Sequence, residues 1–216
     1  SNLPATVIEA KKFMSVLKEY NFKDENITYI PNATSDQMYD AFEVLERKLK
    51  PSDNLLILYS GHGGNDPAKK ISFWMPSDAV RYRDYIKDTD IANYLNSIKA
   101  NNILVLADAC FSGGIVLHKG IDAMPNASLE LHEKRTRKVM SAADDTYSPS
   151  TSLFMRYLQR ALESNENSFI SSQQLFNEIQ MPILNSERVW NSEPLWGPAN
   201  NTDDDIRGDF IFVKNQ

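Results

Sequence analysis

The sequence has a single cysteine among its 216 residues, so no disulfide can form within the chain. It also has no long hydrophobic run: the longest apolar stretches, residues 55–59 and 103–107, are the length of a strand. Positive charge is scarce, with 23 Lys and Arg against 29 Asp and Glu and a net charge of -6. These shortages exclude a disulfide scaffold and a transmembrane helix. They also argue against a nucleic-acid binder that follows phosphates, although not against a cationic substrate.

The N-terminus shows no export signal, because residues 1–4 have neither a basic region nor an apolar core. A processed or truncated chain would have lost such a signal, so the cytoplasmic setting that we expect is only the default. The length and the hydrophobic content of 42% suit one soluble globular domain over residues 1–216, large enough to bury a full core.

Helical and strand-like segments alternate along the chain. Apolar residues recur at helical spacing in residues 4–20, 35–49, 88–98, 152–162 and 171–184. Short segments typical of strands occupy residues 27–30, 55–60, 73–76, 103–107, 139–142 and 209–213. This alternation predicts an α/β fold, with a mostly parallel sheet covered by helices on both faces. Residues 118–138 have little periodicity and are expected to form an exposed loop.

Two of the expected buried strands run into small-residue turns that each carry one reactive side chain. His62 follows the strand at 55–60, and Cys110 follows the strand at 103–107. The carboxyl ends of parallel strands lie at the same edge of a sheet, which is where ligands bind in such folds. A nearby imidazole lowers the pKa of a cysteine thiol and can protonate a leaving amine. The pattern therefore predicts Cys110 as nucleophile and His62 as acid and base, with the N–H groups of Gly63 and Cys110 as oxyanion donors.

Each of these residues has a plainer interpretation when it is taken alone. A lone cysteine is most often a small buried apolar residue, and a histidine at a strand end often makes only structural hydrogen bonds. A metal site is disfavoured, because the flanking residues are glycine and phenylalanine and because His118 and His132 lack the spacing of metal ligands. The presence of both reactive residues at two strand ends favours catalysis.

The segments around the two residues resemble the caspase-like cysteine peptidases of the metacaspase and bacterial caspase-homologue branch. The resemblance lies in LLILYSGHGG at residues 55–64 and LVLADACFSGG at residues 104–114, with weaker likeness at 139–145, 152–158 and 208–212. His62 and Cys110 are 48 positions apart, and a separation of about fifty is a signature of caspases. The resemblance implies the caspase-hemoglobinase fold and endopeptidase activity with no required cofactor. It also implies a part like the large subunit at about 1–130 and a part like the small subunit at about 139–216, joined by a basic loop.

The same resemblance implies a preference for the residue before the cut. In the family, the residue two positions before the nucleophile lines the pocket for that side chain. Asp108 occupies this place, as in metacaspases, whereas true caspases have Gln; a carboxylate there suits Arg or Lys and repels Asp. Ser60 and Asp145, or its neighbour Asp144, would line the same pocket. Each charge-assisted bond to a basic side chain contributes about 1.5–3 kcal/mol. The alternative is that Asp108 only caps the strand end.

Four basic residues precede the strand expected at 139–142, in the region where the family often cuts itself. They are Lys134, Arg135, Arg137 and Lys138. An enzyme that prefers Arg or Lys could process itself at these residues, and the alternative is a solvated charged loop.

The family places a central strand before its first helix, whereas this sequence opens at that helix. A missing central strand would leave hydrogen bonds of both neighbouring strands unsatisfied. We therefore expect either a longer natural protein or a strand from elsewhere, with an upstream regulatory domain or partner protein possible.

Some family members depend on calcium, and the acidic run Asp203, Asp204 and Asp205, with Asp209 beyond it, invites that comparison. The spacing matches no calcium loop and favours a solvated turn.

The expected partner is a protein or peptide substrate with a basic residue at the cut, with no nucleic acid and no membrane. The rival hypothesis is a catalytically silent caspase-like domain that serves as a scaffold in a larger signalling or defence protein. Retention of both His62 and Cys110 argues against it.

Overall fold

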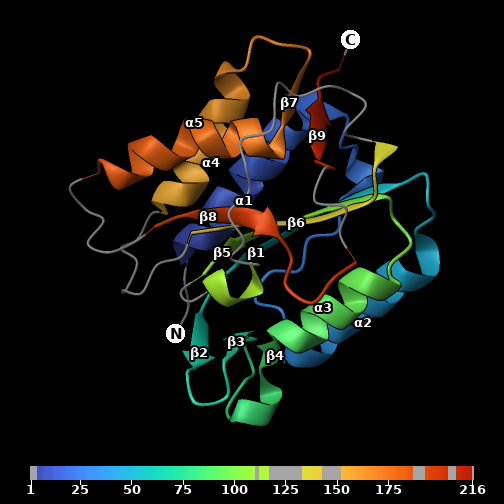
Figure 1. The fold of residues 1–216 in the computed structure, drawn as a ribbon, viewed down its shortest axis with the longest axis vertical. Helices are drawn as coiled ribbons and strands as arrows, with labels where there is room; N and C mark the ends of the chain where they lie inside the picture. Colours follow the sequence, from blue (N-terminus) through green and yellow to red (C-terminus); the bar gives the residue numbers. More distant parts are fainter. Residues whose placement is uncertain are drawn as a thin grey trace.

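The main sheet has four strands in the order β1-β5-β6-β8 (Figure 1). The computed structural model describes residues 4–109, 112–116, 133–142, 152–186, 193–203 and 208–215. The strands are β1 (Asn54–Ser60), β5 (Asn102–Asp108), β6 (Thr136–Ser141) and β8 (Leu195–Pro198). Strands β1, β5 and β6 are parallel, and β8 pairs antiparallel with β6. The predicted α/β fold with a mostly parallel sheet is confirmed.

Helices cover both faces of this sheet (Figure 1). One face packs against α1 (Pro4–Leu17), α4 (Leu153–Ser164) and α5 (Ser172–Leu184). The other face packs against α2 (Ser35–Lys48) and α3 (Asp88–Ser97). In the part of the chain that the structure describes, no helix has the length and apolar character needed to cross a membrane. The cytoplasmic setting stays a prediction.

Strand β5 lies between two hydrophobic cores. Leu104 and Leu106 belong to the core beneath α1, α4 and α5, whereas Ile103, Val105 and Ala107 belong to the core beneath α2 and α3. All five side chains are fully buried, because successive residues of a strand point to opposite faces. The continuous apolar run is therefore the consequence of burial on both faces, as the sequence predicts.

Two smaller antiparallel sheets flank the main one. Strands β2 (Gly63–Asp66), β3 (Ile71–Trp74) and β4 (Ile86–Lys87) follow directly after β1. Strands β7 (Phe169–Ser171) and β9 (Ile211–Val213) pair with each other. The short 3-10 helices are η1 (Lys18–Tyr20), η2 (Asp24–Asn26), η3 (Tyr82–Asp84) and η4 (Ser112–Ile115).

Strand β1 is less enclosed than its sequence indicates. Within the described residues it pairs only with β5, and residues 55–60 are half-buried, whereas the apolar run predicts a strand buried on both faces. Residues 27–30 form no strand, so that prediction is wrong: no neighbouring strand in the described ranges supplies the hydrogen bonds of a ladder. The additional central strand inferred from the family stays a prediction.

The exposed loop predicted up to residue 138 ends earlier, because residues 136–138 belong to β6. The side chains of Arg137 and Lys138 are fully buried, and their backbone lies between β5 and β8. The guanidinium of Arg137 donates hydrogen bonds of 2.6–2.9 Å to carbonyls at and just beyond the end of α3, those of Leu95, Ile98 and Ala100. Periodicity could not reveal this burial, because the partners are carbonyls remote in sequence. Self-cleavage after Arg137 or Lys138 stays a prediction, and it would require this part of β6 to open, because both side chains are buried in the folded chain.

Candidate active site

The segment that carries His62 is bonded directly to the end of β5. Ser60, the last residue of β1, lies opposite Asp108, the last residue of β5. The Ser60 hydroxyl donates a 3.0 Å hydrogen bond to Oδ2 of Asp108, and the N–H of Gly61 donates a 3.1 Å bond to the Asp108 carbonyl. The structure thus brings Ser60 and Asp108 together beside His62. Two other predicted site residues, Cys110 and Asp145, lie outside the described residues.

Asp108 has a second partner that comes from a distant part of the chain. Ser152 caps helix α4, and its hydroxyl accepts a 3.1 Å hydrogen bond from the N–H of Met155. The same hydroxyl donates a 2.8 Å bond to Oδ1 of Asp108, while the N–H of Ser152 donates a 2.9 Å bond to Oε1 of Glu9 on α1. Glu9, Ser152 and Asp108 therefore form one network, which we call the acidic network.

The acidic network places two carboxylates close enough to repel each other. Burial raises the pKa of Glu9 above its usual value of 4.5, the hydrogen bond from Ser152 lowers it, and the charge of Asp108 raises it again. Oε2 of Glu9 is buried and has no hydrogen-bond partner among the described residues. The charges of Lys12 and Arg156 lower the pKa of Glu9 in part. A cationic group placed beside Glu9 and Asp108 would meet two carboxylates, one of which has an oxygen available to accept a hydrogen bond.

Sequence reasoning singled out neither Glu9 nor Ser152 as a site residue. Glu9 lies four residues before Phe13 and seven before Val16, which are both buried, so it shares the inner face of α1. The sequence signal that could have identified Glu9 as a site residue was a carboxylate among the apolar residues on the inner face of a helix. Ser152 was recognisable only as the start of a helix, because its contact with Asp108 spans 44 positions of sequence.

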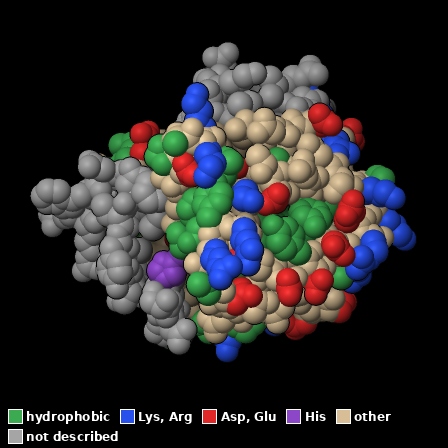
Figure 2. Space-filling view, turned by 90° about the horizontal axis from the view of Figure 1, so that it is seen from below, with side chains coloured by type: hydrophobic (Ala, Val, Ile, Leu, Met, Phe, Trp, Pro, Cys, Tyr) green, Lys and Arg blue, Asp and Glu red, His purple; other side chains and the backbone are tan. Residues whose placement is uncertain are grey.

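His62 is held by its backbone at the junction of β1 and β2. Its side chain is half-buried, and Figure 2 shows a histidine side chain at the surface; His62 is the one histidine among the described residues. Its carbonyl accepts hydrogen bonds from the N–H of Met75 at 2.9 Å and from the hydroxyl of Tyr59 at 2.6 Å. Gly63, the predicted oxyanion donor, begins β2 directly after it.

The remaining candidates for self-cleavage lie at the other end of the sheet. Lys134 and the exposed Arg135 precede β6, and Thr136 lies opposite Asn102, the first residue of β5. Asp108 is six residues further along β5, which corresponds to about 20 Å of extended strand. Arg135 also donates a 3.1 Å hydrogen bond to the Asn96 carbonyl. Lys134 and Arg135 therefore lie far from the acidic network of their own molecule.

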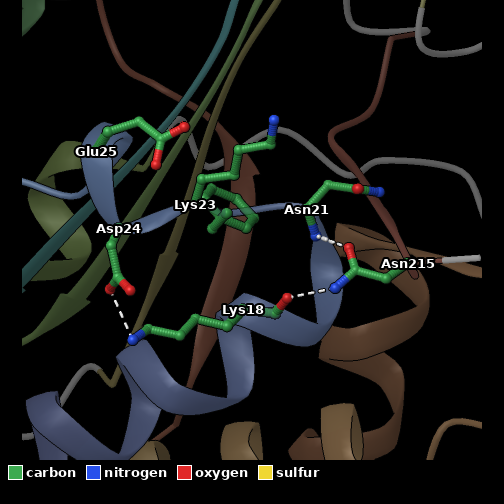
Figure 3. A pocket seen from close by; sticks show the side chains of 7 residues that line it. Lys18, Asn21, Lys23, Asp24, Glu25 and Asn215 are labelled. Carbon is green, nitrogen blue, oxygen red and sulfur yellow. Dashed lines mark hydrogen bonds and ion pairs between the residues drawn. The ribbon is translucent and has the colours of Figure 1, made fainter.

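A metal centre and a surface cavity are the other kinds of site to consider in the described residues. No group of three or more His, Cys, Asp or Glu within those residues could hold a metal ion. A surface cavity of about 490 Å³ is lined by Lys18, Asn21, Phe22, Lys23, Asp24, Glu25 and Asn215 (Figure 3). Several of its polar groups bond to one another, such as Lys18 to Asp24 at 2.6 Å. Asn215 in the lining places the cavity next to the C-terminus, and the C-terminus lies at the opposite end of the molecule from β2 (Figure 1).

Most of the chain is similar to a known protein family. The family model described as Caspase domain matches residues 1–192, which include the segments of His62, Asp108 and Ser152. A comparison with curated proteins found no match.

Proposed function

Because the chain belongs to the caspase domain family, we propose that it is a cysteine endopeptidase that cuts peptide bonds after Arg or Lys. The observation that carries the basic specificity is the acidic network. The carboxylate of Asp108 is fixed by Ser60 and Ser152, and the partly buried Glu9 lies beside it. The presence of Asp rather than Gln at position 108 favours the metacaspase branch of the family.

In the proposed reaction, the thiolate of Cys110 attacks the scissile carbonyl carbon and a carbon–sulfur bond forms. The N–H groups of Gly63 and Cys110 stabilise the negative charge on the carbonyl oxygen. The imidazolium of His62 gives its proton to the leaving amine as the carbon–nitrogen bond breaks. Water, deprotonated by His62, then hydrolyses the thioester and restores the thiolate. These steps need no metal and no cofactor.

The preference for Arg or Lys follows from charge. A guanidinium or ammonium near Asp108 and Glu9 gains charge-assisted hydrogen bonds and relieves the repulsion between the two carboxylates. An aspartate in the same place would add a third negative charge. Asp145, which lies outside the described residues, remains a proposed member of the same pocket.

We propose that self-processing takes place between two molecules. The basic residues accessible for a cut are Lys134 and Arg135, about 20 Å of strand away from Asp108 in the same chain. A second molecule can reach this segment from outside, without the displacement along the strand that a cut within one molecule needs. Cleavage of the Cys110→Ala chain by the active chain, at a rate that rises with enzyme concentration, tests this route by mass spectrometry. A rate independent of dilution would contradict it.

The decisive experiment compares fluorogenic peptides that differ only in ending with Arg, Lys or Asp. The purified chain is assayed beside Cys110→Ala, with and without calcium. Cleavage after Arg or Lys that vanishes in Cys110→Ala supports both the nucleophile and the acidic pocket. Cleavage after Asp keeps the peptidase but overturns the basic preference. Absence of cleavage under both conditions, with a folded chain and all three peptides, would favour the silent scaffold.

A further inference from the structure

Tyr59 connects the end of β1 to the small sheet that follows it. Its ring stacks on that of Trp74 in β3, with the ring centres 4.3 Å apart and the planes 11° from parallel. Trp74 is almost fully buried, and Tyr59 packs against the core beneath α2 and α3. The aromatic part of Tyr59 is thereby fixed, so its hydroxyl has a defined position.

The Tyr59 hydroxyl lies where the backbone of His62 meets that of Met75. It donates a 2.6 Å hydrogen bond to the His62 carbonyl, has the Met75 carbonyl as a second and more distant acceptor at 3.2 Å, and accepts a 3.2 Å bond from the N–H of Met75. The same N–H of Met75 donates a 2.9 Å bond to the His62 carbonyl. The His62 carbonyl thus accepts two hydrogen bonds, one from a side chain and one from the backbone.

The turn before His62 is built closely around this hydroxyl. A Cβ atom at Gly61 would lie 2.8 Å from the Tyr59 oxygen, closer than real contacts allow. Glycine at position 61 therefore permits the backbone to pass the hydroxyl. The position of the Tyr59 hydroxyl therefore depends on the absence of a side chain at residue 61.

Fixing the His62 carbonyl also fixes the direction of the next N–H group. The carbonyl of His62 and the N–H of Gly63 belong to one trans peptide group, in which they point in opposite directions. Since the carbonyl points toward Met75 and Tyr59, the N–H of Gly63 points away from β3, toward the outer edge of β2. This N–H is the proposed oxyanion donor.

We infer that Tyr59 is a positioning residue, whose hydroxyl holds the His62–Gly63 peptide so that the Gly63 N–H is directed at the oxyanion. The inference rests on the proposed peptidase function. Tyr59 acts through this peptide group and need not touch the substrate. The bond also fixes the backbone from which the His62 imidazole extends.

The test removes only the hydroxyl, with Tyr59→Phe, and compares it with Tyr20→Phe. Tyr20 is a matched control, because its hydroxyl also donates a 2.6 Å hydrogen bond to a backbone carbonyl, that of Leu162, remote from His62. For Tyr59→Phe we expect kcat on an Arg peptide to fall about tenfold, with KM within about twofold, because an oxyanion interaction acts mainly in the transition state. Tyr20→Phe should keep the kcat and KM of the unmodified chain.

Two inhibitors separate the oxyanion from general loss of structure. In a peptide that ends in argininal, the Cys110 sulfur adds to the aldehyde carbon and the carbonyl electron pair becomes an oxyanion. The matching argininol peptide binds without a covalent bond. In Tyr59→Phe we expect the inhibition constant of the aldehyde to rise about tenfold and that of the alcohol to stay within about twofold. The ratio is measured on the same folded molecules, so partial unfolding cancels.

The outcomes distinguish this inference from the proposed function. If the unmodified chain cleaves Arg peptides and Tyr59→Phe matches Tyr20→Phe in kcat and in the inhibitor ratio, the positioning role of Tyr59 is overturned and the peptidase stands. If the unmodified chain cleaves no peptide and binds the aldehyde no better than the alcohol, the proposed function is overturned and this inference with it.

Discussion

The surroundings of Arg137 and the acidic network both enclose charged side chains, the first fully and the second in part, and they differ in how the charge is satisfied. The guanidinium of Arg137 donates hydrogen bonds to five backbone carbonyls, among them those of Leu95 and Ile98 near the end of α3. In the acidic network, by contrast, Glu9 lies beside Asp108 and keeps one buried oxygen without a hydrogen-bond partner in the described residues. A charge satisfied by backbone supports the fold, whereas an incompletely satisfied pair of carboxylates is suited to a cationic ligand.

The largest effect on stability is expected at Arg137. Arg137→Met removes a buried cation and leaves carbonyls near the end of α3 without their donors, so the free energy of unfolding should fall by about 3–5 kcal/mol. Urea denaturation at neutral pH measures it. The control is Arg135→Met, an exposed neighbour for which we expect a change of about 0.5 kcal/mol or less. Equal free energies of unfolding for Arg137→Met and Arg135→Met would contradict the conclusion that the buried Arg137 supports the fold.

Asp108 should show the reverse pattern, with a large effect on activity and a small one on stability. Asp108→Asn removes the charge but keeps an oxygen able to accept from Ser60 or Ser152. We expect kcat/KM for an Arg peptide to fall about a hundredfold, or about 3 kcal/mol. The control is Asp84→Asn, because the Asp84 carboxylate likewise accepts two hydrogen bonds, here from the N–H groups of Val80 and Arg81, but lies in η3. Unchanged kcat/KM in Asp108→Asn would rule out the proposed pocket.

Ser152 contributes both to the fold and to the acidic network, since it caps α4 and donates a hydrogen bond to Asp108. Ser152→Ala should lower the free energy of unfolding by about 1 kcal/mol, the usual cost of losing such a cap. It should also raise KM for Arg peptides, because Asp108 loses the hydroxyl of Ser152 as a donor. Ser171→Ala, which removes the cap of α5, is the control: it should reduce stability similarly and leave KM unchanged. Equal KM values in the two variants would assign Ser152 to the fold alone.

The smallest effect is expected from Glu9→Gln. The pKa of Glu9 is raised, so the stabilising contribution of its protonated form is complete below about pH 4.5 and is lost as pH rises through the folded-state pKa. Glu9→Gln should therefore be slightly more stable than the unmodified chain near neutral pH, with the difference vanishing below about pH 4.5. Urea midpoints measured across pH 4–8 check this. KM for Arg peptides should rise about threefold, since the charge is only partly buried.

The core strand and most helices were predictable because their signals are local. The run at residues 103–107 is apolar throughout, and β5 is buried on both faces. Strand β8 was missed because it is four residues long and contains Gly197 and Pro198, so only its pairing with β6 makes it a strand. Strand β2 was missed for the same reason, since it begins with Gly63 and Gly64.

The candidate site was predictable only in part. The sequence motifs point to His62, Ser60 and Asp108, and the structure places them at two bonded strand ends. They could not point to Glu9, whose bond to Ser152 joins residues 143 positions apart. Nor could they show that Arg137 is buried while its neighbour Arg135 is exposed.

The sequence by itself determined the long helices, the buried core strand, the mostly parallel sheet and the two motifs at strand ends, because periodicity and turn chemistry act over a few residues. Only the tertiary structure decided which charges are buried, that Glu9 and Ser152 meet Asp108, and that Tyr59 supports the His62 carbonyl. The physical reason is that burial and hydrogen bonding depend on which distant segments pack together, and local preferences do not specify that.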